Sequence, residues 1–220
     1  PSLSDGKIAY QLGADIHLYD IASNKDTALD IALVSDFDQT REKWVQKPME
    51  YLTAVHLSPD GDRIVLTARG QVFVAPAGQG RFVVVTRKKD VRYRGAFFMP
   101  DGKTLLAITD ESGELEFCKL PANGVGDPER LTNDGKVFRF DGVPSPDGKI
   151  VAYTDKDQQL WIYNIDQKKQ TRVAVSMEDG FNDLRWSPDS KWLAYVETAA
   201  NSFRQIKLYH LTDGRTTILT

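Results

Sequence analysis

The stretch Ser145-Pro146-Asp147-Gly148, followed by the apolar run Ile150-Val151-Ala152-Tyr153, decides the fold that this sequence predicts. Proline presets φ at the second position of a type I turn, serine can cap the first position, and glycine suits the fourth. A short apolar run bounded by turns is typical of a β-strand that is covered on both faces. The stretch therefore predicts a tight turn that leads into a buried strand.

This turn, or a close relative of it, occurs five times in the 220 residues. The copies are Ser4-Asp5-Gly6, Ser58-Pro59-Asp60-Gly61, Met99-Pro100-Asp101-Gly102, Ser145-Pro146-Asp147-Gly148 and Ser187-Pro188-Asp189-Ser190. From Gly61 to Ser190 the successive intervals are 41, 46 and 42 residues. The first interval is 55 residues because of an insertion at 34–51. A period in the low forties is that of a four-stranded β-propeller blade.

Three predicted strands follow each turn. The second strand of each unit is apolar and lies at 8–10, 64–66, 105–108, 150–153 and 192–195. The third strands, once aligned, share one apolar column and one variable column that we expect to face outward more often. The apolar column is Leu18, Val74, Phe117, Ile162 and Leu208, and the variable column is His17, Phe73, Glu116, Trp161 and Lys207. A polar fourth strand, suited to an outer edge, is predicted at 27–31, 82–86, 129–132, 171–175 and 216–219.

The predicted fold is all-β, a β-propeller of about five four-stranded antiparallel blades. A single segment, 1–220, would contain repeat units near 1–33, 52–90, 91–133, 134–176 and 177–220. The first unit begins with a strand reduced to 1–4, whereas closed propellers usually combine strands from both termini in one blade. We therefore expect an incomplete part of a six- or seven-bladed propeller, whose apolar blade faces need neighbouring chain to cover them.

Composition and motifs argue against several classes of function. With 28 basic and 31 acidic side chains the charge is too balanced for nucleic-acid binding. The longest apolar runs are too short for membrane insertion. Cys118 is the only cysteine, and His17, His56 and His210 lack metal-ligand spacing, so we expect no metal and no cofactor. The acid pairs Asp36-Phe37-Asp38 and Asp155-Lys156-Asp157 are better explained as turn formers than as calcium ligands. Without a Gly-x-Ser-x-Gly elbow, we expect no catalytic residue in this chain.

Two segments are candidates for contacts with a peptide or another domain. The densest basic run holds Arg87, Lys88, Lys89, Arg92 and Arg94, in a link that should reach the rim of the central channel. Guanidinium groups there could hold a peptide carboxylate in bidentate fashion; the alternative is a solvated loop. Trp44, in the insertion 34–51, is a candidate anchor against another domain or chain, or a packing residue on the propeller itself.

Three segments follow one another in a distinctive order: the insertion Ser35-Asp36-Phe37-Asp38-Gln39-Thr40-Arg41-Glu42-Lys43-Trp44, the turn Leu57-Ser58-Pro59-Asp60-Gly61 and the hairpin Ala68-Arg69-Gly70-Gln71-Val72-Phe73. In these segments the sequence resembles the tricorn-type propellers of bacterial and archaeal tricorn protease homologues. The resemblance implies a non-catalytic propeller segment of a multidomain serine peptidase, in which propellers filter or channel oligopeptides. It also implies contacts with other domains or subunits of that peptidase, and it leaves a homo-oligomer of the full-length protein open.

Two alternatives come from propellers with similar turns. One is a free-standing protein-interaction propeller of the Tol-system type. The other is the propeller of a prolyl-oligopeptidase-like hydrolase, which gates an α/β-hydrolase domain. Of the two compartments considered, the periplasm is slightly favoured over the cytoplasm.

Overall fold

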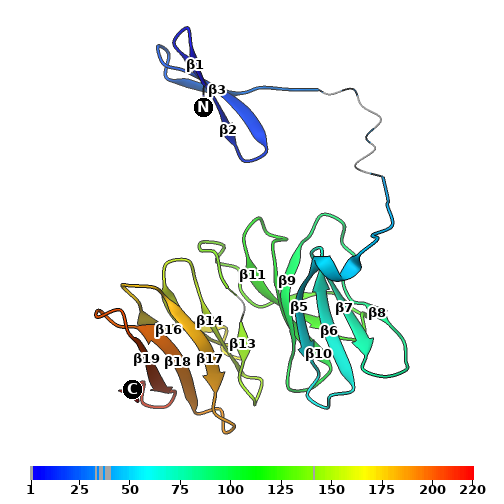
Figure 1. The fold of residues 1–220 in the computed structure, drawn as a ribbon, viewed down its shortest axis with the longest axis vertical. Coiled ribbons are helices and arrows are strands. Elements are labelled where there is room, and N and C mark those ends of the chain that lie inside the picture. Colours follow the sequence, from blue (N-terminus) through cyan, green and yellow to red (C-terminus); the bar gives the residue numbers. More distant parts are fainter. Residues whose placement is uncertain (1, 33, 35–36, 38–40, 141) are drawn as a thin grey trace. The chain divides into compact units, whose positions relative to one another are not determined.

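The computed structural model describes residues 2–32, 34, 37, 41–140 and 142–220, and it divides the chain into two units, Pro1–Gln46 and Lys47–Thr220. The first unit holds one antiparallel sheet (Figure 1). Its strands, in spatial and sequence order, are β1 (Ser2–Ser4), β2 (Lys7–Leu12), β3 (Asp15–Asp20) and β4 (Lys25–Ala28). The first unit is thus a four-stranded meander.

The turn between β1 and β2 differs from the type I turn that we expected. Ser4 pairs directly with Lys7, so the loop has only two residues, and both have positive φ: 51° at Asp5 and 71° at Gly6. Two-residue turns of this mirror-image kind match the right-handed twist of the flanking strands. Because this copy lacks the proline, nothing fixes a negative φ at its second position.

The second unit contains four antiparallel sheets, each built from four consecutive strands, after a short 3-10 helix at Pro48–Tyr51 (Figure 1). The sheets are β5 (Leu52–Leu57), β6 (Arg63–Ala68), β7 (Gln71–Pro76), β8 (Val83–Val84); β9 (Tyr93–Phe98), β10 (Thr104–Thr109), β11 (Glu116–Pro121), β12 (Glu129–Arg130); β13 (Val143–Pro144), β14 (Ile150–Thr154), β15 (Gln159–Asn164), β16 (Lys169–Val175); and β17 (Phe181–Trp186), β18 (Trp192–Thr198), β19 (Arg204–His210), β20 (Thr216–Ile218). The prediction of an all-β fold with five four-stranded antiparallel sheets is confirmed.

The Pro-Asp-Gly turns join the first and second strands of the sheets in the second unit. In the third of them, Gly148 N donates to Ser145 O at 2.8 Å and closes the turn. Ser145 Oγ accepts from Ile150 N at 3.0 Å and donates to Asp147 Oδ1 at 2.6 Å. Ser187 makes the equivalent bonds with Trp192 N and Asp189 Oδ1. The capping role predicted for the serine is confirmed.

Three apolar clusters fill the spaces between consecutive sheets of the second unit. Leu105 belongs to the cluster shared with β6 and β7, whereas its neighbour Leu106 belongs to the cluster shared with β14 and β15. Val151 and Ala152 divide in the same way between the second and third clusters. Since successive side chains of a strand point to opposite faces, each interior sheet is buried on both faces. The sheets therefore stack face to face in chain order, as propeller blades do.

Two outer strands are shorter than the sequence predicts, because a threonine side chain replaces part of the ladder. We expected strands at 82–86 and 129–132, and β8 and β12 have two residues each. Val72 N donates to Thr86 Oγ1 at 2.8 Å, and Phe117 N donates to Thr132 Oγ1 at 2.9 Å. These hydroxyls occupy the donors that further strand pairing would use.

The prediction that the variable column of the third strands faces outward more than the apolar column was right for Phe73 and Val74 and wrong for Glu116, and in the other three units both columns are half-buried. Val74 and Phe117 of the apolar column are buried, and Leu18, Ile162 and Leu208 are half-buried. Glu116, which we expected to face outward, is fully buried beside Arg139. Arg139 Nη1 donates to Glu116 Oε2 at 2.8 Å.

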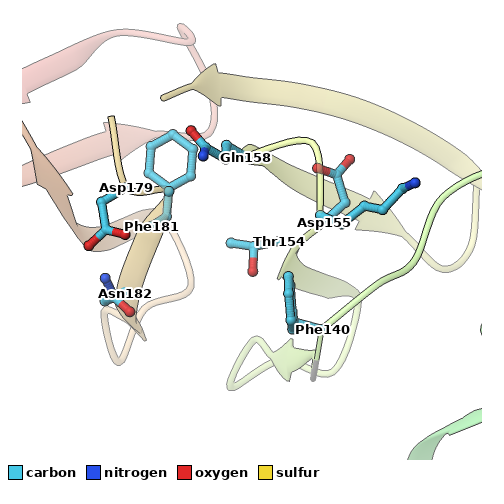
Figure 2. Close-up of a pocket in the computed structure, with 9 residues that line it drawn as sticks. Phe140, Thr154, Asp155, Gln158, Asp179, Phe181 and Asn182 are labelled. Atoms are coloured by element: carbon cyan, nitrogen blue, oxygen red, sulfur yellow. The ribbon is translucent and has the colours of Figure 1, made fainter. Parts of the chain in front are cut away.

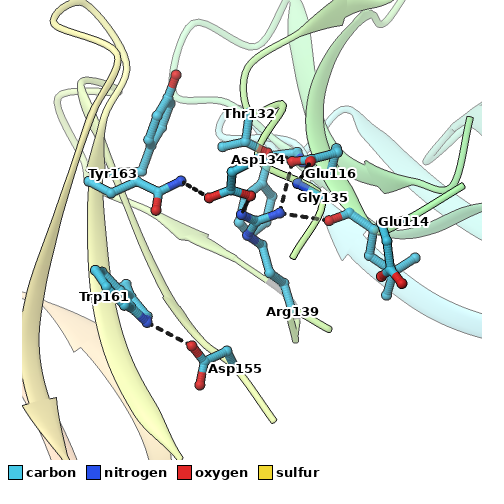
Figure 3. A network of polar contacts seen from close by, with 12 residues as sticks. Glu114, Glu116, Thr132, Asp134, Gly135, Arg139, Asp155, Trp161 and Tyr163 are labelled. Carbon is cyan, nitrogen blue, oxygen red and sulfur yellow. Dashed lines mark hydrogen bonds and ion pairs between the residues drawn. The ribbon is translucent and has the colours of Figure 1, made fainter. Parts of the chain in front are cut away.

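The partners of this pair join two sheets (Figure 3). Arg139 Nη2 also donates to Asp134 Oδ1, and Gln170 Nε2, on β16, donates to Asp134 Oδ2 at 2.9 Å. Gly135 N donates to Glu116 Oε1 at 2.5 Å, and Thr132 Oγ1 donates to Glu116 Oε2. A buried carboxylate is tolerated only when it is paired and hydrogen-bonded. The cation that makes this burial possible is 23 residues away in sequence.

The acid pair at 155–157 behaves as predicted. Asp155 Oδ1 accepts from Asp157 N and Gln159 N, each at 3.0 Å, and Trp161 Nε1 donates to Asp155 Oδ2 at 2.8 Å (Figure 3). The carboxylate therefore forms the turn between β14 and β15. The other pair, Asp36 and Asp38, lies outside the described residues.

Candidate functional site

The structure divides the basic run into two groups. Arg92 and Arg94 line a pocket of about 610 Å³. Arg87 and Lys89 are exposed, and Lys88 Nζ pairs with Glu111 Oε1. We call the first site the arginine pocket; its lining residues are Glu50, Tyr51, Thr53, Arg69, Gly70, Arg92, Tyr93 and Arg94.

Sequence reasoning missed Arg69 as a member of this site. Arg69 and Gly70 form the two-residue turn between β6 and β7, with φ of 50° and 76°. The Arg69 guanidinium lies 4.9 Å from the centre of the Tyr51 ring, a cation–π distance. An arginine in the left-handed region is uncommon, and strained backbone is concentrated at functional sites. The Arg-Gly turn is the signal in the sequence that points to this residue.

Backbone hydrogen bonds fix Arg92 against two hairpins. Arg92 N donates to Asp110 Oδ1 at 2.8 Å, and Tyr93 N donates to Gly70 O at 2.8 Å. A Cβ atom built on Gly70 would lie 2.8 Å from Arg92 Cγ, so this approach requires glycine. The pocket wall is therefore set by the backbone of two neighbouring sheets.

Arg94 connects the arginine pocket to a second one. Its guanidinium lies 5.3 Å from the centre of the Phe138 ring. Arg94 also lines a pocket of about 330 Å³, together with Phe140, Val143, Thr154, Phe181, Asn182, Asp183, Leu184 and Arg185. Arg94 thus lines both pockets.

A third pocket, of about 490 Å³, continues from the second (Figure 2). Figure 2 shows Asp179, Phe181 and Asn182 on one side and Phe140, Thr154 and Asp155 on the other. Phe140, Thr154, Phe181 and Asn182 line both pockets. We call the three pockets together the groove, since each shares at least one lining residue with the next. Its walls come from residues at or beside the first strands β5, β9, β13 and β17, which face the axis of a propeller, and from the turns that join β6 to β7 and β14 to β15.

The three arginines of the arginine pocket have no acidic partner among the residues that the structure describes. The ion pairs found there involve other cations, and Glu50 pairs with Lys47 at 3.2 Å. Burial raises the pKa of Tyr93, another lining residue, to about 12. Three uncompensated guanidinium groups around one cavity attract an anion.

Trp44, the other predicted contact residue, belongs to the first unit and is 99% exposed. Within the described parts of the chain, no group of three or more His, Cys, Asp or Glu side chains is placed to hold a metal ion. The same parts contain no helix of the length and apolarity needed to cross a membrane.

Stacked four-stranded meanders define the chain as a β-propeller protein, and comparison with known proteins gives the family. The family model described as the tricorn protease second beta propeller domain matches residues 52–220. The chain belongs to this family.

Individual relatives agree with the family match. The tricorn protease homolog of Saccharolobus solfataricus is 33% identical over 220 residues, which cover 99% of this chain and 19% of the relative. The crystal structure of the tricorn protease matches with a TM-score of 0.70 and 18% identity, over 97% of this chain and 21% of that one. TolB from Acinetobacter baumannii matches with a TM-score of 0.57 and 21% identity, over 96% of this chain and 50% of that one. The chain spans about a fifth of the length of its tricorn relatives.

Proposed function

We propose that this chain is a non-catalytic propeller segment of a tricorn-family serine peptidase, and that its groove shapes and gates the access of oligopeptides. The observation that carries the proposal is the arginine pocket, where Arg69, Arg92 and Arg94 share one cavity without an acidic partner among the described residues. Arg94 of this pocket also lines the middle pocket of the groove.

The chemistry of the groove suits a peptide. Guanidinium groups bind carboxylates through paired, charge-assisted hydrogen bonds. Phe140 is 46% exposed in the pockets beyond Arg94 and offers an apolar surface to side chains. A basic end beside an aromatic wall fits an unfolded peptide better than a nucleic acid, whose phosphates need a continuous basic surface.

Contacts with other parts of the peptidase belong to the same proposal. The remaining predicted contact residues do not line the groove. Trp44, Arg87 and Lys89 are exposed and have no described ion pair, whereas Lys88 pairs with Glu111. We assign them to docking against other domains or subunits, including a second copy in a homo-oligomer. We also propose that residues 1–220 form one propeller segment, with boundaries between repeat units near 33, 52, 90, 133 and 176.

The family match favours this function over a free-standing interaction propeller and over the propeller of a prolyl-oligopeptidase-like hydrolase. The likeness to TolB is below 25% identity and shows the fold alone.

Fluorescence anisotropy with a labelled eight-residue peptide that has a free carboxylate tests the proposal. We expect saturable binding that weakens by about tenfold in the double variant Arg92→Gln/Arg94→Gln, since each removes a charge-assisted contact. Arg87→Gln is the matched control, because it removes an exposed arginine of the same run from outside the pocket. Absence of binding, or equal losses in R87Q and in the double variant, would contradict the proposal.

A further inference from the structure

We propose that the groove binds peptides in one orientation, with the carboxyl terminus in the arginine pocket and the amino terminus beside Asp179. This inference rests on the proposed function, and it adds a direction that peptide binding alone does not require.

The formal charge of the lining residues changes sign along the groove. The arginine pocket has three arginines and one glutamate, a net charge of +2. The middle pocket has Arg94, Arg185 and Asp183, a net charge of +1. The far pocket has Asp155, Asp179 and Lys156, a net charge of −1. An extended peptide with free termini has the complementary pattern only when its carboxylate lies at Arg69 and Arg92.

Asp179 is the acid best placed for the amino terminus. Asp155 already accepts three hydrogen bonds, from Asp157 N, Gln159 N and Trp161 Nε1, so its oxygens are engaged in the turn. Asp179 is exposed and accepts no hydrogen bond among the described residues. It precedes Phe181, whose ring is buried and packs edge-on against Tyr195 at 5.5 Å. Asp179 lies in the bend two residues before this ring.

The four residues that the middle and far pockets share are uncharged, and two of them are aromatic. Phe140 and Phe181 line both the middle and the far pockets, next to the polar side chains of Thr154 and Asn182. Side chains of either type can contact such a wall, so the termini and not the internal sequence distinguish the two directions. The ligand class is therefore an oligopeptide with both termini free.

The length of that peptide has an upper limit. Stacked sheets lie about 10 Å apart, and three such steps separate the sheet of β5 from the sheet of β17. Strands converge toward a propeller axis, so about 30 Å is the most that the groove can span there. About nine extended residues cover this distance at about 3.3 Å each.

Photo-cross-linking of the whole chain tests the orientation. The probes are two octapeptides with free termini and the same composition, one with benzoylphenylalanine at position two and one with it at position seven. We expect the position-seven probe to attach to residues 50–70 and 92–94, and the position-two probe to attach to residues 154–158 and 179–182 (Figure 2). The reversed pattern, or both probes attached equally at both ends, would overturn the inference while leaving peptide binding intact. Failure of either peptide to bind would overturn the proposed function as well.

Affinity measurements give a second, independent readout. Amidation of the carboxylate should weaken binding by about tenfold in the unaltered chain and by clearly less in R92Q/R94Q, where only Arg69 remains. Acetylation of the amino terminus should weaken binding by about threefold, as exposed charge pairs are weaker, and have no effect in Asp179→Asn. Asp166→Asn, which removes an exposed carboxylate outside the groove, is the matched control. If amidation and acetylation weakened binding equally in every variant, the result would contradict a fixed direction of the peptide.

Discussion

Arg92 Cγ lies 2.8 Å from the position that a Cβ atom on Gly70 would occupy, although Gly70 lies in the turn between β6 and β7 and Arg92 directly precedes β9 of the next sheet. This contact places the Arg69-Gly70 turn against the segment that enters β9. A side chain at position 70, in the turn between β6 and β7, would therefore displace the side chain of Arg92, which we assign to peptide binding.

Gly70→Ala should therefore reduce both stability and binding. The new methyl group must displace Arg92, and φ of 76° is unfavourable for alanine by about 1–2 kcal/mol. Urea unfolding and peptide anisotropy measure the two effects. Gly78→Ala is the control, because nothing lies within 4 Å of its Cβ position. An unchanged Kd for G70A would contradict the role given to this contact.

Arg69→Asn and Arg69→Ala separate function from backbone strain. Both variants lose the guanidinium and its contact with Tyr51, so both should bind the peptide more weakly. Asparagine tolerates the left-handed conformation at φ of 50°, so R69N should be more stable than R69A by about 0.5–1 kcal/mol. Thermal or urea unfolding gives the stability difference. Tight binding by R69N would exclude Arg69 from the site.

Arg139→Met should be among the most destabilising single changes in the chain. It leaves Glu116 buried without its cation, at a cost of about 3–5 kcal/mol. The double variant Glu116→Met/Arg139→Met removes both charges and should recover most of the loss. Urea unfolding of the three proteins provides the measurement. If the double variant were no more stable than R139M, the pair would not be the source of the effect.

The pH dependence of stability should include a contribution from Asp189. Hydrogen bonds from Ser187 Oγ and Lys191 N lower the pKa of this carboxyl below its ordinary value of 3.8. A depressed pKa in the folded state gives stability that is complete above pH 3.8 and lost as the pH falls through the lowered value.

Asp189→Asn removes that contribution, so the free energy of unfolding should fall less steeply with acid in D189N than in the unaltered chain. Unfolding by urea at several values between pH 5 and pH 2.5 measures the slope. D166N, which removes an exposed carboxylate without a described hydrogen bond, is the matched control. Identical slopes in D189N and D166N would show that the turn does not hold the carboxylate in its ionised form.

The sequence predicts the sheets well because their signals are local. The Pro-Asp-Gly turns and the apolar runs after them lie within a few residues of each other. The hydrogen bond from Ile150 N to Ser145 Oγ can therefore be predicted from the local sequence. Outer strands are predicted less well, since Thr86 and Thr132 end them by bonds to strands that lie about 15 residues earlier.

The site is only partly predictable for the same reason. Charge density along the chain identifies Arg92 and Arg94, but Arg69 joins them only through the packing of one hairpin against the next link. Burial of Glu116 depends on Arg139, which no local pattern connects with it. Interactions between sheets, rather than the propensities of single segments, decide these features.

The division of Leu105 and Leu106 between two clusters has a consequence for cooperativity. An interior sheet takes part in two apolar clusters, one on each face, so its local opening exposes both clusters to solvent at once. A sheet at either end of the second unit adjoins only one of these clusters. Amide protons on β10 and β14 should then exchange with solvent last, and those on β5 and β20 first, as in a one-dimensional array coupled between nearest neighbours.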